Sequence, residues 1–135
     1  MNRDRTKTGL FMMEMILVIL LFAVSAAVCM RIFGAADRAE RRSSDISSAV
    51  MAAETAAEAY KARKGDLAQT AALTGGTASA DTLVVCYDES WRQCARGKER
   101  FVLRLEQRAV SVANIRVCEG DTELFAITVA AEAAE

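Results

Sequence analysis

The pattern of hydrophobic and polar positions divides the chain into parts with different periods. Leu10–Met30 is an almost unbroken apolar run of about 21 residues, and a helix rises about 1.5 Å per residue. Such a run is long enough to cross the ~30 Å hydrocarbon core of a membrane. We therefore predict a membrane-spanning helix over residues 10–30, preceded by a short basic leader over residues 1–9.

Residues 31–64 continue with a helical pattern. They are rich in Ala, Arg and Glu, which are strong helix formers, and contain no proline. One stripe of apolar residues recurs at spacings of four and three, which places it on one face. It consists of Ile46, Val50, Ala53, Ala57 and Tyr60. We predict one continuous helix from about Leu10 to about Lys64, with an amphipathic second part that Gly65-Asp66 stops.

The rest of the chain changes to a period of two. Residues 65–81 are rich in Gly, Ser, Thr and Ala, and we interpret them as a linker with a helical turn at its start. Residues 82–135 then predict a small antiparallel sheet. Its alternating segments are Thr82–Tyr87, Phe101–Glu106, Val110–Val117 and Leu124–Val129.

Within the third of these segments the alternation shifts between Val112 and Ile115, so we predict a bulge near Ala113-Asn114. One face of the sheet is expected to pack on the apolar stripe of the helix. The expected architecture is α+β: a long N-terminal helix, membrane-spanning in its first half, packed by its second half on a small antiparallel sheet.

Composition excludes several function classes. The net charge is −1, and the chain has no histidine, the commonest general base and metal ligand. No paired carboxylates, nucleophile motif or phosphate loop is present, so we expect no enzyme, no cofactor and no metal site. The basic residues between Arg92 and Arg100 alternate with acids, as in a solvated loop, and direct binding of nucleic acid is not expected.

Four cysteines remain to be explained. Cys29 ends the apolar run, whereas Cys86, Cys94 and Cys118 lie in the C-terminal half. These three permit one disulfide and one free thiol in an oxidising compartment. A bond between Cys86 and Cys94 closes the shortest loop, and a bond from either residue to Cys118 is equally permitted.

The start of the apolar run carries a more specific signal. Gly9 is followed by the hydrophobic Leu10, and Glu14 is the fifth residue after the glycine, inside an otherwise apolar helix. This segment resembles the type III signal of type IV pilins and pseudopilins. The resemblance implies that a membrane-embedded prepilin peptidase cuts between Gly9 and Leu10 on the cytoplasmic face and N-methylates Leu10. The sequence motif supports this resemblance over about residues 1–60. For the rest of the chain, only the expected order of a helix followed by a sheet supports it.

The resemblance also implies partners and a location. Pilin-like subunits reside in the cytoplasmic membrane with the C-terminal domain outside the cytoplasm. They then assemble with other pilin-like subunits into a filament, through a membrane platform protein and an assembly ATPase. Such filaments serve adhesion, motility, DNA uptake or secretion. In this chain Phe11 is second after the cleavage point rather than first, and the helix has no proline kink. These departures favour a pseudopilin or minor pilin over a major pilin.

Glu14 has a specific expected role in this scheme. After cleavage Leu10 would bear an α-ammonium group, and the Glu14 carboxylate of one subunit would pair with that amine of its neighbour. The pair would fix the axial register of apolar helices that otherwise slide. The alternative is a stray carboxylate near the membrane boundary that reaches the headgroups.

Other readings of the whole chain stay open. The first is a single-pass anchored extracytoplasmic module that does not assemble and keeps its leader. The second is an inverted orientation, because basic residues flank both ends of the apolar run. The third is a secretory signal peptide removed near Ser25-Ala26-Ala27.

Overall fold

The computed structural model describes residues 2–131 of the 135-residue chain, with side chains from Lys7 onward. Met1 of the predicted leader and residues 132–135 of the predicted sheet region lie outside the described residues. The chain forms two compact units, one up to Arg42 and one from Ser43.

The first element is helix α1, Asn2–Ala62, whose residues up to Arg42 make up the first unit. The predicted start at Leu10 is wrong, because the helix already includes the leader residues from Asn2. No proline interrupts these residues, and Gly9, although a weak helix former, is accommodated within the helix.

The end of α1 follows from its sequence. Lys64 and Gly65 adopt left-handed backbone conformations with φ of 51° and 85°, and the Gly65 N–H donates to the carbonyl of Tyr60 at 3.0 Å. With the bond from the Lys64 N–H to the Lys61 carbonyl, this is the Schellman pattern that ends helices, with Lys64 in the left-handed position and Gly65 after it. The predicted stop at Gly65-Asp66 is confirmed.

The segment predicted as a flexible linker is instead ordered. It contains helix α2, Leu67–Thr74, and strand β1, Thr77–Ser79. The Asp66 carboxylate accepts from the Gln69 N–H at 3.1 Å and caps the start of α2, and Gly75 with φ of 67° ends it. The predicted helical turn at the start of this segment is confirmed and extends over eight residues, from Leu67 to Thr74. The prediction of a flexible connection after it was wrong, because residues 77–79 pair with β2.

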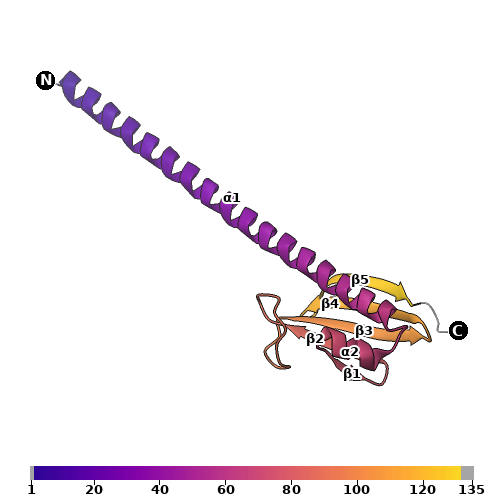
Figure 1. Ribbon diagram of the computed structural model, residues 1–135. Coiled ribbons are helices and arrows are strands. Elements are labelled where there is room, and N and C mark those ends of the chain that lie inside the picture. Colours follow the sequence, from indigo (N-terminus) through magenta and orange to yellow (C-terminus); the bar gives the residue numbers. More distant parts are fainter. Residues whose placement is uncertain (1, 132–135) are drawn as a thin grey trace. The chain divides into compact units, whose positions relative to one another are not determined.

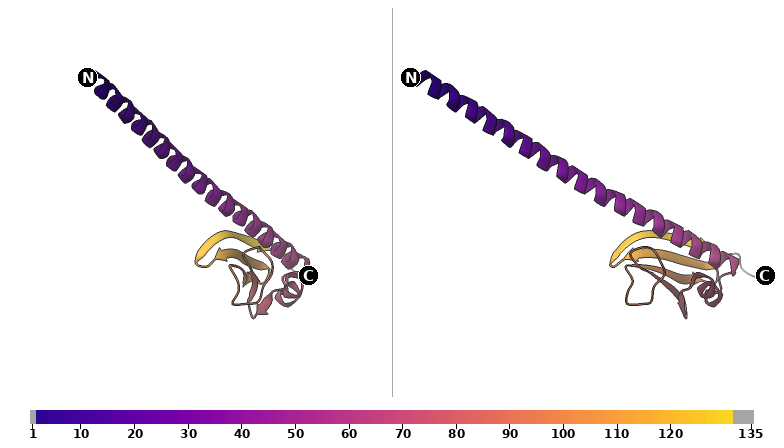
Figure 2. Two further views of the ribbon diagram at one scale, coloured as in Figure 1. Left: turned by 90° about the vertical axis from the view of Figure 1, so that its left-hand side faces the viewer. Right: turned by 60° about the vertical axis from the view of Figure 1, so that its left-hand side comes forward.

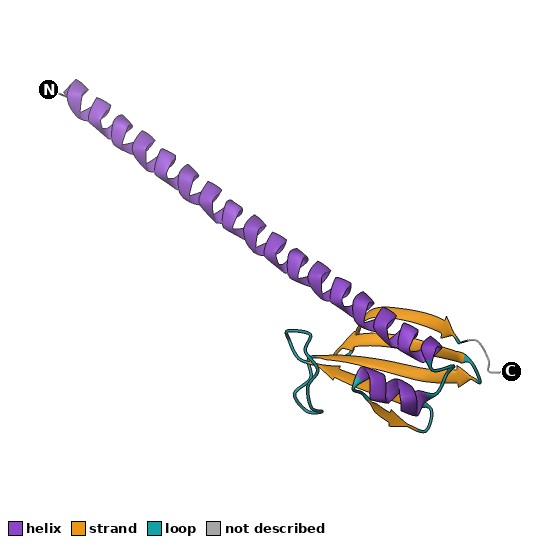
Figure 3. Ribbon diagram, viewed as in Figure 1, coloured by secondary structure: helices purple, strands orange, loops and turns teal. Residues whose placement is uncertain are grey.

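The sheet has five strands in the order β1-β2-β3-β4-β5, and every neighbouring pair is antiparallel. A long loop between β2 and β3 extends beyond the end of the sheet (Figure 3). The four longer strands are β2, Thr82–Tyr87; β3, Phe101–Ala109; β4, Val112–Glu119; and β5, Thr122–Ala130.

The predicted bulge near Ala113-Asn114 is wrong. Both residues pair regularly with β3, and the register shifts instead between Gln107 and Ala109 and between Val117 and Cys118. The burial along β4 alternates regularly, with Ala113, Ile115 and Val117 buried, whereas Val112 lies on the opposite face and Val110 lies in the turn before the strand. The apolar Val112 on the outer face therefore imitates a shift of phase in the sequence pattern.

The last turns of α1 and the whole of α2 lie on one face of the sheet (Figures 1 and 2). The fold class is therefore α+β, as predicted: the second half of the long helix packs on an antiparallel sheet. The buried helix positions differ in part from the predicted stripe, since Ile46 and Val50 are not buried. The residues of α1 that are buried are Ala49, Ala53, Ala56, Ala57 and Tyr60.

Four of these five helix residues are alanines. Small side chains let the helix backbone approach the sheet closely, and this explains why alanines rather than Ile46 face the strands. The sheet contributes larger side chains from β2, β3 and β4 to the same cluster. They are Leu83, Val85, Leu103, Leu105, Ile115 and Val117.

Candidate functional site

The residues predicted to be processed and to direct assembly all lie in one uninterrupted stretch of α1. Gly9, Leu10 and Glu14 are helical and exposed. Leu10 and Glu14 are four positions apart, so their side chains lie on the same helix face about one turn from each other. The structure therefore presents the predicted cleavage point and the predicted assembly carboxylate together on one surface.

The apolar side chains around Glu14 are uncovered by the rest of the chain. From Leu10 to Phe33 the large hydrophobic side chains are between 48% and 79% exposed. By length and composition α1 can cross a membrane, a criterion that core helices and signal sequences also meet. Exposed apolar surface on this scale is unfavourable in water and indicates that lipid or other protein covers it.

Glu14 has no ion-pair partner among the residues whose side chains the structure describes. The same apolar run holds one hydroxyl, Ser25, whose Oγ donates to the Leu21 carbonyl at 2.9 Å. The helix backbone therefore provides a hydrogen-bond acceptor for the Ser25 hydroxyl, but the helix provides no cationic partner for the Glu14 carboxylate among the described side chains. Any counter-charge for Glu14 lies outside the residues whose side chains the structure describes.

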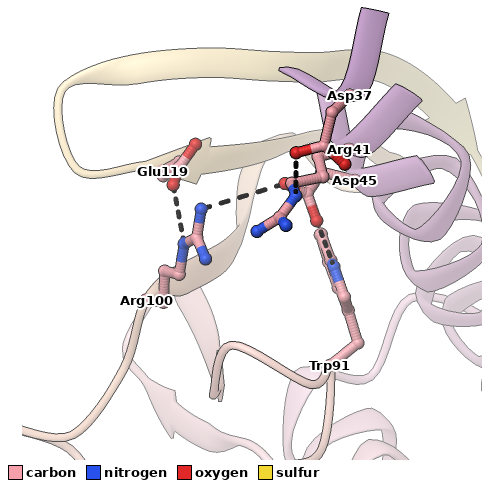
Figure 4. Close-up of polar contacts among 6 residues, drawn as sticks. All are labelled: Asp37, Arg41, Asp45, Trp91, Arg100 and Glu119. Atoms are coloured by element: carbon pink, nitrogen blue, oxygen red, sulfur yellow. Dashed lines mark hydrogen bonds and ion pairs between the residues drawn. The ribbon is translucent and has the colours of Figure 1, made fainter. Parts of the chain in front are cut away.

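In the second unit, Asp45 organises a polar cluster between α1 and the β2–β3 loop (Figure 4). Its Oδ1 accepts a hydrogen bond of 3.1 Å from the Trp91 indole Nε1. Its Oδ2 lies 4.0 Å from Arg100 Nη2, and Arg100 Nε donates to Glu119 Oε1 at 2.8 Å. The bond to Glu119 raises the pKa of Arg100, so the guanidinium is permanently charged.

Trp91 and Tyr87 are partly buried and pack against the core. Trp91 stacks on Phe101 with ring centroids 4.1 Å apart, and both Trp91 and Tyr87 pack against the buried cluster. Trp91 adopts φ of 57°, unusual for a bulky side chain, which this packing holds in place. Beside the two rings lies a hollow of about 290 Å³, whose other lining residues are Ser48, Met51, Ala52 and Thr55.

Two further contacts of charged side chains lie within the β2–β3 loop. Arg92 lies 3.6 Å from Asp88, and the Glu99 carboxylate accepts from the Gly97 N–H. Among the described residues, no group of three or more His, Cys, Asp or Glu side chains could hold a metal ion. The contacts of the Asp45 cluster join the β2–β3 loop to α1 and to the end of β4.

The sequence did not connect Asp45 or Glu119 with Arg100 and Trp91, because nothing in the local pattern around either acid distinguishes it from a solvent-exposed one. Only the fold brings them to Arg100 and Trp91. The three C-terminal cysteines are all half-buried and unbonded, and Cys86 is paired through the backbone with Cys94. Comparison of the chain with protein-family models, with curated proteins and with solved structures gives no match.

Proposed function

We propose that the chain is a type IV pilin-like subunit, a pseudopilin or minor pilin, that assembles through its N-terminal helix into an extracytoplasmic filament. The observation that carries the proposal is Glu14: an unpaired carboxylate in an exposed apolar helix, five residues after Gly9. Inserting a charge near the centre of a membrane helix costs about 2.5–3.5 kcal/mol, and less toward the end. A carboxylate at this position therefore has to serve a purpose that offsets its cost.

Processing would occur between Gly9 and Leu10. A peptidase has to draw its substrate out of the helix into an extended conformation. Glycine destabilises a helix interior by about 1 kcal/mol relative to alanine, so Gly9 weakens the helix locally at the bond to be cut. A Cβ at Gly9 would meet no heavy atom within 4 Å, so packing within the described chain does not explain the glycine.

Assembly would use the new α-ammonium group of Leu10. Opposite charges 4 Å apart attract by about 4 kcal/mol at an effective dielectric of 20, much of it offset by desolvation. Removing one partner of such a buried pair typically costs about 3–5 kcal/mol. Glu14 would thus select one axial offset between neighbouring helices. The sheet-bearing unit would be displayed outside the cytoplasm, and the other partners would be the prepilin peptidase, the platform protein and the assembly ATPase.

Intact mass spectrometry of the membrane-extracted protein tests the processing step. A chain that starts at N-methylated Leu10 supports the proposal. A chain that retains Met1 identifies instead an anchored module that does not assemble, and a start near Val28 identifies a secreted protein.

Substitution of Glu14 tests the assembly step. Glu14→Ala and Glu14→Gln are expected to insert and to be cut normally, but to be lost from sheared filaments. Met13→Ala, a change at the adjacent exposed position, is the matched control and is expected to assemble. Normal recovery of either Glu14 variant in filaments contradicts the proposed role.

A further inference from the structure

Cys94 lies beside Cys86, one residue beyond an isolated bridge to β2. Cys86 lies near the end of β2, and the chain returns beside it through an antiparallel bridge between Tyr87 and Gln93. The Cys94 N–H donates to the Cys86 carbonyl at 3.0 Å. Residues opposite each other in an antiparallel pair have Cα atoms about 5.5 Å apart when hydrogen-bonded, inside the 4.4–6.8 Å range of disulfides.

The two thiols also share a face of the sheet. Along β2 the buried side chains are Leu83 and Val85, so Cys86 points to the opposite face, away from α1. Directly opposed residues of an antiparallel pair lie on the same face, which places Cys94 beside Cys86.

The same register excludes Cys118 as a partner. Cys86 pairs with Val102 of β3, and Val102 pairs with Cys118 of β4. Neighbouring strands lie about 4.8 Å apart, so Cys86 and Cys118 are separated by about 10 Å with a strand between them. Cys94 lies at the other edge of β2 and is farther still. Of the disulfide pairings that the sequence permits, the geometry therefore leaves only Cys86 with Cys94.

We propose that Cys86 and Cys94 form an intramolecular disulfide that closes the segment carrying Trp91 and leaves Cys118 as a free thiol. The inference rests on the proposed function in one respect: an oxidising compartment requires that this unit lie outside the cytoplasm.

The oxidant is a disulfide-bearing acceptor, and the exchange balances in two steps. The thiolate of one cysteine attacks a sulfur of the acceptor, forms a mixed disulfide and expels the first acceptor thiolate. The second cysteine loses its proton and attacks the first cysteine's sulfur, which expels the second acceptor thiolate. The two protein thiols lose two protons and two electrons, and the acceptor disulfide is reduced to two thiols.

The surroundings of the thiols favour a structural bond over a redox sensor. Burial, with the negative charge of Glu99, raises the pKa of Cys86. Burial, with the charges of Asp88 and Glu99, raises the pKa of Cys94. Thiolates are therefore scarce at neutral pH, and uncatalysed oxidation is expected to be slow and to accelerate as the pH rises.

The Cys86–Cys94 disulfide would join the two ends of residues 86–94, the segment in which Trp91 packs against the core. Trp91 stacks on Phe101 and bonds to Asp45, so this segment already has a defined conformation. A crosslink that spans it removes freedom chiefly from the unfolded chain. For a loop of this size and a domain of this length, the melting temperature is expected to rise by about 10 °C.

Tryptic mapping of the purified full-length chain in detergent, oxidised with glutathione disulfide, tests the pairing. The three C-terminal cysteines fall in separate tryptic peptides, residues 65–92, 93–96 and 117–135, because Arg92 and Arg96 are cleavage sites. Linkage of peptides 65–92 and 93–96 that a reductant releases supports the proposal. Linkage of either to peptide 117–135, or three free thiols after oxidation, overturns it.

Two variants sharpen the test. Cys118→Ser is expected to keep the link and the rise in melting temperature, and Cys94→Ser is expected to lose both. If the two cysteines do not pair in the purified protein, the disulfide proposal is wrong. A chain that starts at methylated Leu10 would still support the proposed processing. A link that forms after purification but is absent from cells, when thiols are alkylated at lysis, contradicts the extracytoplasmic location instead.

Discussion

The indole Nε1 of Trp91 donates a hydrogen bond of 3.1 Å to Oδ1 of Asp45, joining the β2–β3 loop to a helix 46 positions earlier in the chain. The second carboxylate oxygen of Asp45 faces Arg100, which also pairs with Glu119 at the end of β4. The carboxylate of Asp45 thus contacts both Trp91 in the loop and Arg100, the residue just before β3. The chain has a single tryptophan, so fluorescence reports on this contact directly.

Asp45→Ala is expected to lower the free energy of unfolding of the sheet-bearing unit by about 1–3 kcal/mol, because it removes the acceptor of a part-buried hydrogen bond. Denaturant unfolding of the detergent-solubilised chain, followed by Trp91 fluorescence, measures the change. Asp45→Asn keeps an acceptor for the indole and is expected to lose less. Asp37→Ala, which removes an exposed pair with Arg41, is the control and is expected to change stability by no more than about 0.5 kcal/mol. Equal losses for Asp37→Ala and Asp45→Ala would contradict this account.

Tyr60 is fully buried, and its hydroxyl lacks a hydrogen-bond partner in the described part of the chain. Burial raises the pKa of Tyr60, and the nearby Gln107 side chain offsets a smaller part of this shift. Tyr60→Phe is therefore expected to leave the melting temperature unchanged or to raise it. Tyr60→Ala leaves a cavity and is expected to cost about 3–5 kcal/mol. A large loss for Tyr60→Phe would reveal a hydrogen bond to water or to a partner.

Ala53 has no exposed surface and lies between the helix backbone and the sheet. Ala53→Leu is expected to destabilise the unit by about 1–3 kcal/mol, because added volume forces the helix away from the strands. Ala39→Leu makes the same change at an exposed position of α1 and is expected to have little effect on thermal unfolding. Similar melting temperatures for the two variants would show that the helix does not pack on the sheet in solution.

Asp66 caps α2, and the bond from the Gln69 backbone amide lowers the pKa of Asp66 below its ordinary value of 3.8. A carboxyl with a lower pKa in the folded state contributes stability above its unfolded pKa, and this contribution is lost as the pH falls through the folded value. Asp66→Asn keeps a capping side chain but does not titrate. The stability advantage of the natural chain over Asp66→Asn is therefore expected to shrink below about pH 4. Thermal melts across the acid range measure it, and a pH-independent difference would rule out this coupling.

The sequence alone determined the features that depend on local physics. A long apolar run, helix formers without proline and Gly65 dictated a long helix and its end, and alternation of apolar residues dictated an antiparallel sheet. The spacing of Gly9, Leu10 and Glu14 is likewise a property of the sequence, and it remains the basis of the proposed function.

Tertiary structure decided what depends on proximity between distant positions. The pairing of Asp45 with Trp91 and Arg100 requires a helix and a loop to meet, which no local pattern encodes. The strand order decided that Cys86 faces Cys94 rather than Cys118, since cysteine spacing permits each pairing and only the register of β2, β3 and β4 separates them. Tertiary structure also decided that Ala49 and Ala56 are buried in place of Ile46, because close approach to a sheet favours small side chains over the most hydrophobic ones.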